Sequence, residues 1–248
     1  MWRLEFSLSE QGPRARHEDA HRYWLSSDKE AFVGVVCDGV GGNPCGDIAS
    51  QVAAEAWTKF MSAEIQSGNT LSQSLLMQAC ESAWKALINK SLEKKLCAAM
   101  ATTIVACAAQ GPLVLALHCG DSRLYHIRKG QVLFVTRDHT LLNDLVLQGA
   151  VSEEEAKASG RSNVLSRVLS ANLGRPPRPE FHLLHPACPG DFLLLCSDGV
   201  WAYVPEEDLM ELLCHDSPAP AKLQQLKEVC GALTGDNFTA QLWTYLPD

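Results

Sequence analysis

The 248-residue sequence has no Cys-x-x-Cys pair, no run of lysine or arginine, and no long apolar segment. The missing cysteine pair removes the usual signature of zinc ribbons and thioredoxin-like enzymes. A net charge of −8 without a basic run disfavours nucleic acid and anionic membranes as partners. The longest apolar stretch, residues 97–109, is too short to span a bilayer. We therefore expect a protein that binds neither nucleic acid nor membrane.

The cysteines and the first residues predict the compartment. Of the ten cysteines, Cys37, Cys107, Cys119 and Cys196 lie in apolar runs, where a free cysteine behaves as a small buried hydrophobe. The segment from residue 1 to residue 6 lacks the charged start and long apolar core of a signal peptide. We therefore expect a protein of the reducing cytoplasm.

No linker, low-complexity tract or internal repeat divides the chain, so we expect one domain over residues 1–248. Apolar periodicity predicts strands at 2–8, 23–25, 31–37, 101–108, 113–119, 122–127, 131–136, 180–185, 192–196 and 237–244. It predicts helices from residue 46, at 71–92, within 139–160, at 205–214 and at 219–232. The four strands between 101 and 136 are expected to form an antiparallel meander, with a tight turn at Lys129-Gly130.

This order of elements predicts an α+β fold. Strands before and after two pairs of helices favour a four-layer αββα sandwich, in which two antiparallel sheets pack together and helix pairs cover the outer faces.

Acidic residues occur where strands are expected to end. Asp38 and Asp198 each follow an apolar run and precede glycine, where the backbone can turn and a ligand can approach closely. The other candidate carboxylates are Glu18-Asp19, Asp121 and Asp236. If they converge, two charges about 4 Å apart repel by roughly 4 kcal/mol at an effective dielectric near 20. Such a cluster requires a cation, which indicates a hydrolase that uses divalent metal ions.

The ligand types favour particular metals and a particular chemistry. Hard oxygen ligands without histidine favour Mg²⁺ or Mn²⁺ over zinc. Two such ions about 3.5–4 Å apart can hold both the attacking and the leaving oxygen of an in-line displacement, and they lower the pKa of a bridging water. A planar guanidinium such as that of Arg14 can bind two phosphate oxygens.

Eight motifs cover nearly the whole chain, and they are GPRARHEDA at 12–20, DGVGG at 38–42, GDIAS at 46–50, CGDSR at 119–123, RDH at 137–139, SNVLSR at 162–167, SDGVW at 197–201 and GDN at 235–237. In order and spacing they resemble the metal-dependent (PPM, type 2C) serine/threonine protein phosphatases. The Gly-Val-Gly-Gly after Asp38 resembles the bacterial branch. The resemblance implies two Mn²⁺ or Mg²⁺ ions and a third, weaker site.

The resemblance also implies roles for individual residues. Asp38 would bridge the first two metals and Gly39 would supply its carbonyl. Glu18 would bind one metal, largely through water. Asp198 and Asp236 would hold the other metal.

Four further roles follow from the same resemblance. Asp121, with Asp198, would form the third site. Asp19 would orient metal-bound water, Arg14 would bind the substrate phosphate, and Asn237 would support the site around Asp236.

Three positions depart from the family pattern. His17 stands where bacterial members have asparagine; it is either a proton-transfer group or a surface or supporting histidine. Val40 stands where eukaryotic relatives have a histidine proposed to protonate the leaving oxygen, so the leaving-group acid is unassigned. The segment Ala101-Thr102-Thr103 replaces a glycine-containing strand start, which we interpret as packing variation. His118 and His139 are interpreted as structural.

The resemblance implies a phosphatase that acts on phosphoserine and phosphothreonine in proteins by attack of a metal-bridging hydroxide and opposes a bacterial Ser/Thr kinase. Two alternatives remain: a catalytically weak binding module on the same fold, and a phosphatase dedicated to one regulator, such as a secretion-system component. We expect a monomer, with a flap at residues 144–166 beside the active site that contributes to substrate selection.

Overall fold

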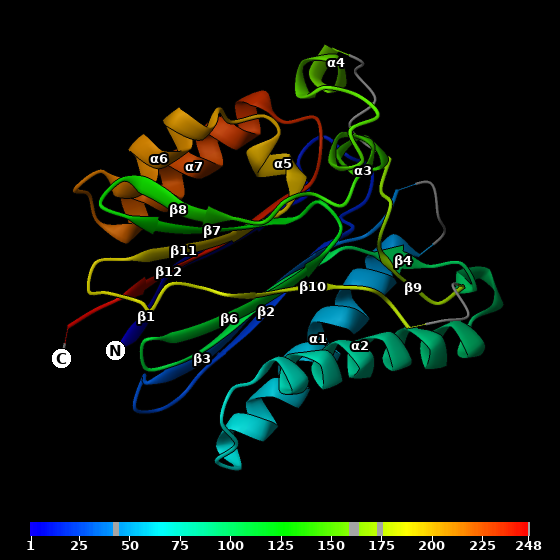
Figure 1. The fold of residues 1–248 in the computed structure, drawn as a ribbon, viewed down its shortest axis with the longest axis horizontal. Coiled ribbons are helices and arrows are strands. Elements are labelled where there is room, and N and C mark those ends of the chain that lie inside the picture. The colour runs from blue at the N-terminus through cyan, green and yellow to red at the C-terminus, as the bar shows by residue number, and fades with distance from the viewer. Residues whose placement is uncertain (42–44, 159–163, 173–175, 248) are drawn as a thin grey trace.

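The computed structural model describes residues 1–41, 45–158, 164–172 and 176–247 (Figure 1). Two antiparallel sheets of five strands lie at its centre. The first has the order β1 (Trp2–Glu10), β12 (Phe238–Tyr245), β11 (Phe192–Cys196), β7 (Arg123–Arg128) and β8 (Gln131–Val135). The second has the order β10 (Glu180–Leu183), β6 (Leu113–Cys119), β5 (Ile104–Gln110), β3 (Ala31–Asp38) and β2 (Asp19–Leu25).

Helices cover the outer faces of both sheets, as Figure 1 shows. The long helices α1 (Gly46–Gln66) and α2 (Gln73–Glu93) lie against the second sheet, and α6 (Glu206–Cys214) and α7 (Ala219–Leu233) lie against the first. The predicted α+β sandwich of four layers is therefore confirmed.

Each interface between layers has its own apolar core. Between the sheets, aromatic side chains pack in contact, and the rings of Phe32 and Trp243 stack with centroids 4.1 Å apart. The α1 face buries Ala49, Ala53 and Trp57, whose spacing follows the helical period. Small residues on this face let the helix approach the sheet closely, and the two packed sheets give the site a rigid base.

The segment from residue 101 to residue 136 differs from the predicted meander. Thr103 interrupts the first strand, so that β4 (Ala101–Thr102) pairs with β9 (Leu169–Ser170) in a separate two-stranded ladder. Strands β5 and β6 pair in the second sheet, whereas β7 and β8 pair in the first. The chain crosses between the sheets at residues 120–122, where Gly120 has a φ of 119°. The prediction of one continuous meander was wrong because a short polar connection fits either path.

The hairpin between β7 and β8 agrees with the predicted turn. Lys129 and Gly130 have φ values of 51° and 77°, as a two-residue turn with left-handed backbone requires. The first of these positions carries a side chain against the usual preference for glycine or asparagine.

The region of the predicted flap contains α3 (Leu141–Leu147) and α4 (Glu153–Ala158). Residues 159–163 of the proposed flap lie outside the described residues. Two further short helices were not predicted: α5 (Asp198–Trp201) and the 3-10 helix Lys95–Cys97.

Cys45 and Cys97 form a disulfide across 52 residues. The sequence-based assignment to a reducing compartment did not anticipate this bond. It joins the residue before α1 to the segment that follows α2. Within the part of the chain that the structure describes, no helix combines the length and apolar character of a membrane span.

Candidate metal centre

Strand ends bring the predicted carboxylates together at the crossing between the sheets. Asp19 begins β2 and Asp38 ends β3, and the two are direct partners across this strand pair. Asp198 follows the end of β11 and opens α5, while Asp121 lies on the connection from β6 to β7. Asp236 stands two residues before β12, the neighbour of β11. Both sheets therefore supply acidic residues to one cluster.

Burial and, after it, mutual repulsion raise the pKa values of these carboxyl groups. Burial raises the pKa of Asp38 well above its ordinary value, and the charges of Asp19, Asp198 and Asp121 raise it further. Burial raises the pKa of Asp19 to about 7 and that of Asp121 to about 7. The Asp38 and Asp198 carboxyls lie close enough to share a proton, since only a protonated carboxyl can donate to the other. In the absence of a cation, protons relieve the repulsion.

Two buried oxygens of this cluster have no partner among the described residues: Oδ1 of Asp19 and Oδ1 of Asp198. The other Asp19 oxygen accepts a hydrogen bond from Ser197 Oγ at 2.7 Å, which fixes the orientation of the carboxylate. A buried acceptor without a donor is unfavourable by about 1–3 kcal/mol, and more when it is charged. A divalent cation bound between these oxygens would satisfy them, so the residues present fit a metal site.

Glu18 lies against the start of α1. Its main-chain carbonyl accepts a hydrogen bond from Gly39 N at 3.0 Å. A Cβ atom added to Gly46 would lie 3.0 Å from Glu18 Oε1, and one added to Gly39 would lie 2.4 Å from the Gly46 carbonyl. Both glycines are therefore required for the close approach that places Glu18 beside the Asp38-Gly39 turn.

Asn237 fastens the N-terminal loop to the turn before β12. Its Oδ1 accepts from Glu18 N at 2.8 Å, and its Nδ2 donates to the carbonyls of Gln11 at 2.6 Å and Arg16 at 2.9 Å. The side chain thereby uses one acceptor and both donor hydrogens on the main chain. Asn237 thereby joins the loop that carries Glu18 to the turn that carries Asp236.

Arg14 lies at the rim of the cluster. Its side chain is 53% exposed and forms an ion pair with Asp236, while Nε donates to the Gly235 carbonyl at 3.0 Å. The Arg14 guanidinium therefore lies next to the carboxylate cluster and is paired with one of its members, Asp236.

Comparison with known proteins decides the family. The family model for protein phosphatase 2C matches residues 12–246. The chain belongs to the protein phosphatase 2C family. It is 31% identical over 216 residues to the serine/threonine phosphatase stp of Listeria innocua, covering 84% of this chain and 82% of that protein. The resemblance inferred from the motifs is confirmed, and with it the prediction of a metal-dependent serine/threonine protein phosphatase.

Solved structures agree with this assignment. The serine/threonine phosphatase PstP/Ppp of Mycobacterium tuberculosis superposes with a TM-score of 0.83 at 27% identity, over 99% of each chain. The catalytic domain of PstP in complex with two manganese ions superposes with a TM-score of 0.77 at 25% identity, again over 99% of each chain.

Two threonines that sequence reasoning assigned to packing bind the Asp38 backbone of this phosphatase. Thr103 Oγ1 accepts from Asp38 N at 3.0 Å and Thr103 N donates to Asp38 O at 2.8 Å. Thr102 Oγ1 donates to the same carbonyl at 2.8 Å. Thr103 Oγ1 also bonds Ser122 Oγ at 2.7 Å, beside Asp121. The interpretation as packing variation was incomplete, because the hydroxyls hold two carboxylate-bearing segments together.

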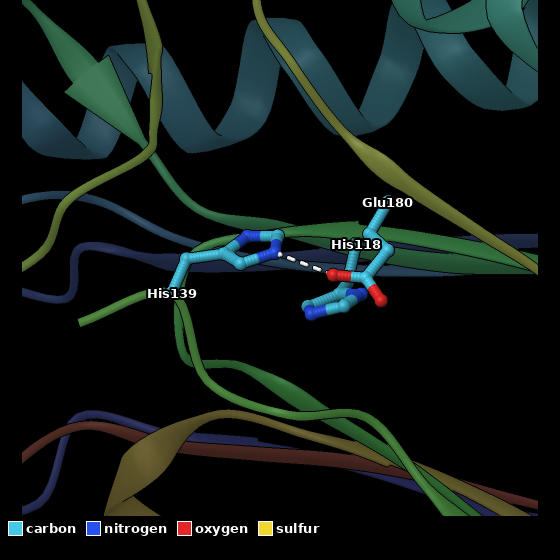
Figure 2. Close-up of side chains that lie close together, drawn as sticks. All are labelled: His118, His139 and Glu180. Atoms are coloured by element: carbon cyan, nitrogen blue, oxygen red, sulfur yellow. Dashed lines mark hydrogen bonds and ion pairs between the residues drawn. The ribbon is translucent and has the colours of Figure 1, made fainter. Parts of the chain in front are cut away.

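A second group of possible ligands comes from β6, from the segment before α3, and from β10. His118, His139 and Glu180 offer atoms within 4.8 Å of one another (Figure 2). However, His118 Nε2 donates to the Arg137 carbonyl at 2.8 Å, and His139 Nδ1 accepts from Gly120 N at 3.3 Å. The remaining His139 nitrogen bonds Glu180 at 3.2 Å. The two imidazole rings stack 4.2 Å apart, so their in-plane lone pairs do not meet at one point. These contacts agree with the predicted structural role of both histidines.

His17 is held in place through its Nε2 atom. Nε2 lies 2.8 Å from Ser9 Oγ, which in turn bonds Thr239 Oγ1 at 3.0 Å. The buried Nδ1 has no hydrogen-bond partner among the described residues. The imidazole thus connects the motif loop to β1 and β12, which favours the supporting interpretation over a proton-transfer role.

Proposed function

We propose that this phosphatase hydrolyses phosphoserine and phosphothreonine in proteins at the carboxylate cluster, with two Mn²⁺ or Mg²⁺ ions bound there. The observation that carries the proposal is the pair of buried, unpartnered oxygens on Asp19 and Asp198 inside a cluster of like charges. Clusters of this kind are stable with a hard divalent cation, and the ligand set contains only oxygen.

The individual ligands are assigned by the family resemblance of the motifs. Asp38 would contribute to both ions. The carbonyl of Gly39 and Glu18 would hold one of them, and Asp198 and Asp236 would hold the other. Asp121 would complete a weaker third site with Asp198. Ions bound there would lower the pKa of a coordinated water, so that hydroxide is available near neutral pH.

The side chains of this protein have separate tasks. Ser197 donates to Asp19 and leaves one Asp19 oxygen free, so Asp19 can accept a proton or orient the attacking water. Arg14 would exchange its bond to Asp236 for the substrate phosphate, since a guanidinium binds phosphate through two parallel hydrogen bonds. Val40 has no titratable group, and the leaving oxygen would take its proton from water.

The finer setting of the enzyme is also a proposal. We infer a cytoplasmic monomer that opposes a Ser/Thr kinase and has phosphoproteins as substrates, on the basis of the motifs and the absence of a basic run. The domain boundaries 1–248 and the role of the 144–166 flap in substrate selection remain predictions. A flap in which residues 150–161 are replaced by a neutral linker is expected to change the preference among phosphopeptides.

The experiment that tests the proposal replaces the phosphate ligand. Arg14→Lys keeps the charge and loses the planar fork, so KM for a phosphothreonine peptide is expected to rise about tenfold or more. Arg3→Lys, at the exposed opposite end of β1, is the matched control and is expected to leave KM unchanged. Equal KM values for both variants would contradict the assignment of Arg14.

A further inference from the structure

Two side chains connect the segments that carry Asp121 and Asp198. Trp201 ends α5, the helix that Asp198 begins, and its Nε1 donates to the main-chain carbonyl of Asp121 at 3.0 Å. Arg123 stands two residues after Asp121, and its guanidinium carbon lies 3.4 Å from the centroid of the Trp201 ring. Each carboxylate segment therefore contributes one member of a stacked pair.

The guanidinium is itself held firmly. Arg123 Nε and Nη2 donate to the two oxygens of Asp138, both at 2.8 Å, and Nη1 donates to Tyr125 Oη at 3.1 Å. The Arg123 side chain is 24% exposed and that of Asp138 is 9% exposed. A bidentate pair of this kind fixes the plane of the guanidinium as well as its position. The indole therefore stacks on a surface that cannot easily rotate away.

The arrangement restrains Asp121 on both sides. Trp201 holds the carbonyl of Asp121, and the next residue, Ser122, is held by Thr103 at 2.7 Å. Thr103 also bonds the Asp38 backbone. Hydrogen bonds therefore connect the Asp121 turn both to Asp38, through Thr103, and to α5, through Trp201. The indole contact ties the same turn to the helix that begins at Asp198.

We propose that Arg123 and Trp201 are positioning residues that hold Asp121 against Asp198 and so set the affinity of the third, weakest metal site. The inference deepens the proposed function and rests on it. Arg123 acts on the metal ligand Asp121 through the indole of Trp201. Groups that orient a ligand without touching the ion commonly change metal affinity by 10–100-fold.

The test uses two pairs of matched variants. Trp201→Phe keeps a ring for Arg123 to stack on and removes the N–H bond to Asp121. Trp84→Phe is its control, because Trp84 Nε1 also donates to a carbonyl, that of Ser170, at 3.1 Å. Arg123→Lys removes the bidentate pair, and Arg128→Lys removes a comparable pair with Asp191 at 2.8 and 2.7 Å.

Mn²⁺ binding is measured by calorimetry on metal-free protein without substrate, together with the Mn²⁺ dependence of hydrolysis. Trp201→Phe and Arg123→Lys are expected to weaken the weakest Mn²⁺ class on the order of tenfold and to leave the tighter classes in place. Hydrolysis lost at low Mn²⁺ should return when Mn²⁺ is raised. The two controls should bind Mn²⁺ as wild type does, even where they lose stability.

Two results would overturn the inference. One is a wild-type Mn²⁺ isotherm for both Trp201→Phe and Arg123→Lys. The other is an equal loss of Mn²⁺ affinity at every class of site, together with the same loss in the Trp84→Phe control. That result would identify a general structural effect. Mn²⁺ binding is measured without substrate, so the two proposals can fail separately. If the weakest Mn²⁺ site is present and the two variants weaken it, but the wild type hydrolyses no phosphopeptide, the proposed function is wrong and the positioning role is supported.

Discussion

Replacing Asp198 by asparagine is expected to stabilise the metal-free protein and to abolish its stabilisation by metal. The Asp198 carboxyl lies beside that of Asp38 and is repelled by the charge of Asp236. Asparagine keeps nearly the same shape and removes one negative charge. The same substitution therefore removes a repulsion in one state and a metal ligand in the other.

The magnitudes follow from the geometry. Two carboxylates about 4 Å apart repel by roughly 4 kcal/mol at an effective dielectric near 20. A shared proton relieves part of this repulsion, so we expect a gain of about 1–3 kcal/mol for the metal-free variant at pH 8. A metal that binds only the folded chain adds about 2.7 kcal/mol at a hundred times its Kd. The wild type should gain this and the variant should not.

Thermal unfolding followed by circular dichroism, in EDTA and in excess Mn²⁺, measures both effects. At this chain length, 1 kcal/mol corresponds to a shift of about 2–4 °C in Tm. Asp191→Asn is the matched control, since Asp191 lies before the opposite end of β11 and accepts hydrogen bonds from Arg128 and His126. It should lower Tm in both conditions and keep the manganese shift.

A drop in Tm of Asp198→Asn in EDTA, similar to that of Asp191→Asn, would refute the reasoning. So would a manganese shift of wild-type size in Asp198→Asn. Either result would mean that Asp198 does not belong to a cluster that requires a cation.

Three further outcomes are expected. Asp19 and Asp121 have a pKa raised from 3.8 to about 7, so between these values the folded, metal-free chain holds protons that the unfolded chain has released. The free energy of unfolding by urea in EDTA should therefore fall as the pH rises from 4 to 7, by about 1.4 kcal/mol per pH unit for each such proton. A rise of this free energy over the same range would contradict the assignment. Gly199→Ala places a Cβ 1.9 Å from the Asn237 carbonyl and should lower the unfolding free energy by about 1–3 kcal/mol. Its control is Gly231→Ala, whose Cβ meets nothing within 4 Å and which should stabilise α7 by about 0.5–1 kcal/mol. Similar urea midpoints for both variants would show that the approach of Gly199 to Asn237 is not rigid. Cys45→Ser removes a disulfide that spans 52 residues and should destabilise the folded protein by about 2–4 kcal/mol without reductant. Its control is Cys188→Ser, at an exposed free cysteine, which should leave Tm unchanged. Equal Tm values for the two variants would indicate that the disulfide does not form in solution.

The fold was largely predictable because its elements have strong periods. The apolar run at residues 31–37 of β3 and the helical period of α2 each favour one structure, and the Lys129-Gly130 turn favours one hairpin. The crossing at residues 120–122 was not predictable, because β6 and β7 have the apolar pattern of hairpin partners. Helix α5 is only four residues long, which is too short for a periodic signal.

The candidate site was predictable where chemistry is local to a motif. Carboxylates that follow strands and precede glycine were found in this way, and the structure brings Asp38 and Asp198 into contact. The contacts of Thr103 and Trp201 depend on which strands pair, so no local pattern reveals them. The Cys45–Cys97 bond is similar, since spacing alone does not give a disulfide partner.

The most direct test of the central claim is hydrolysis of a phosphothreonine peptide with Mn²⁺, with Mg²⁺ and with EDTA, for the wild type and Asp198→Ala. The carboxylate cluster predicts phosphate release by the wild type with metal, none in EDTA, and none from a folded Asp198→Ala protein. Wild-type turnover by folded Asp198→Ala, or metal-independent turnover by the wild type, would contradict the assignment of this cluster as the catalytic metal centre. A folded wild type that is inactive with both metals would instead support the binding-module alternative.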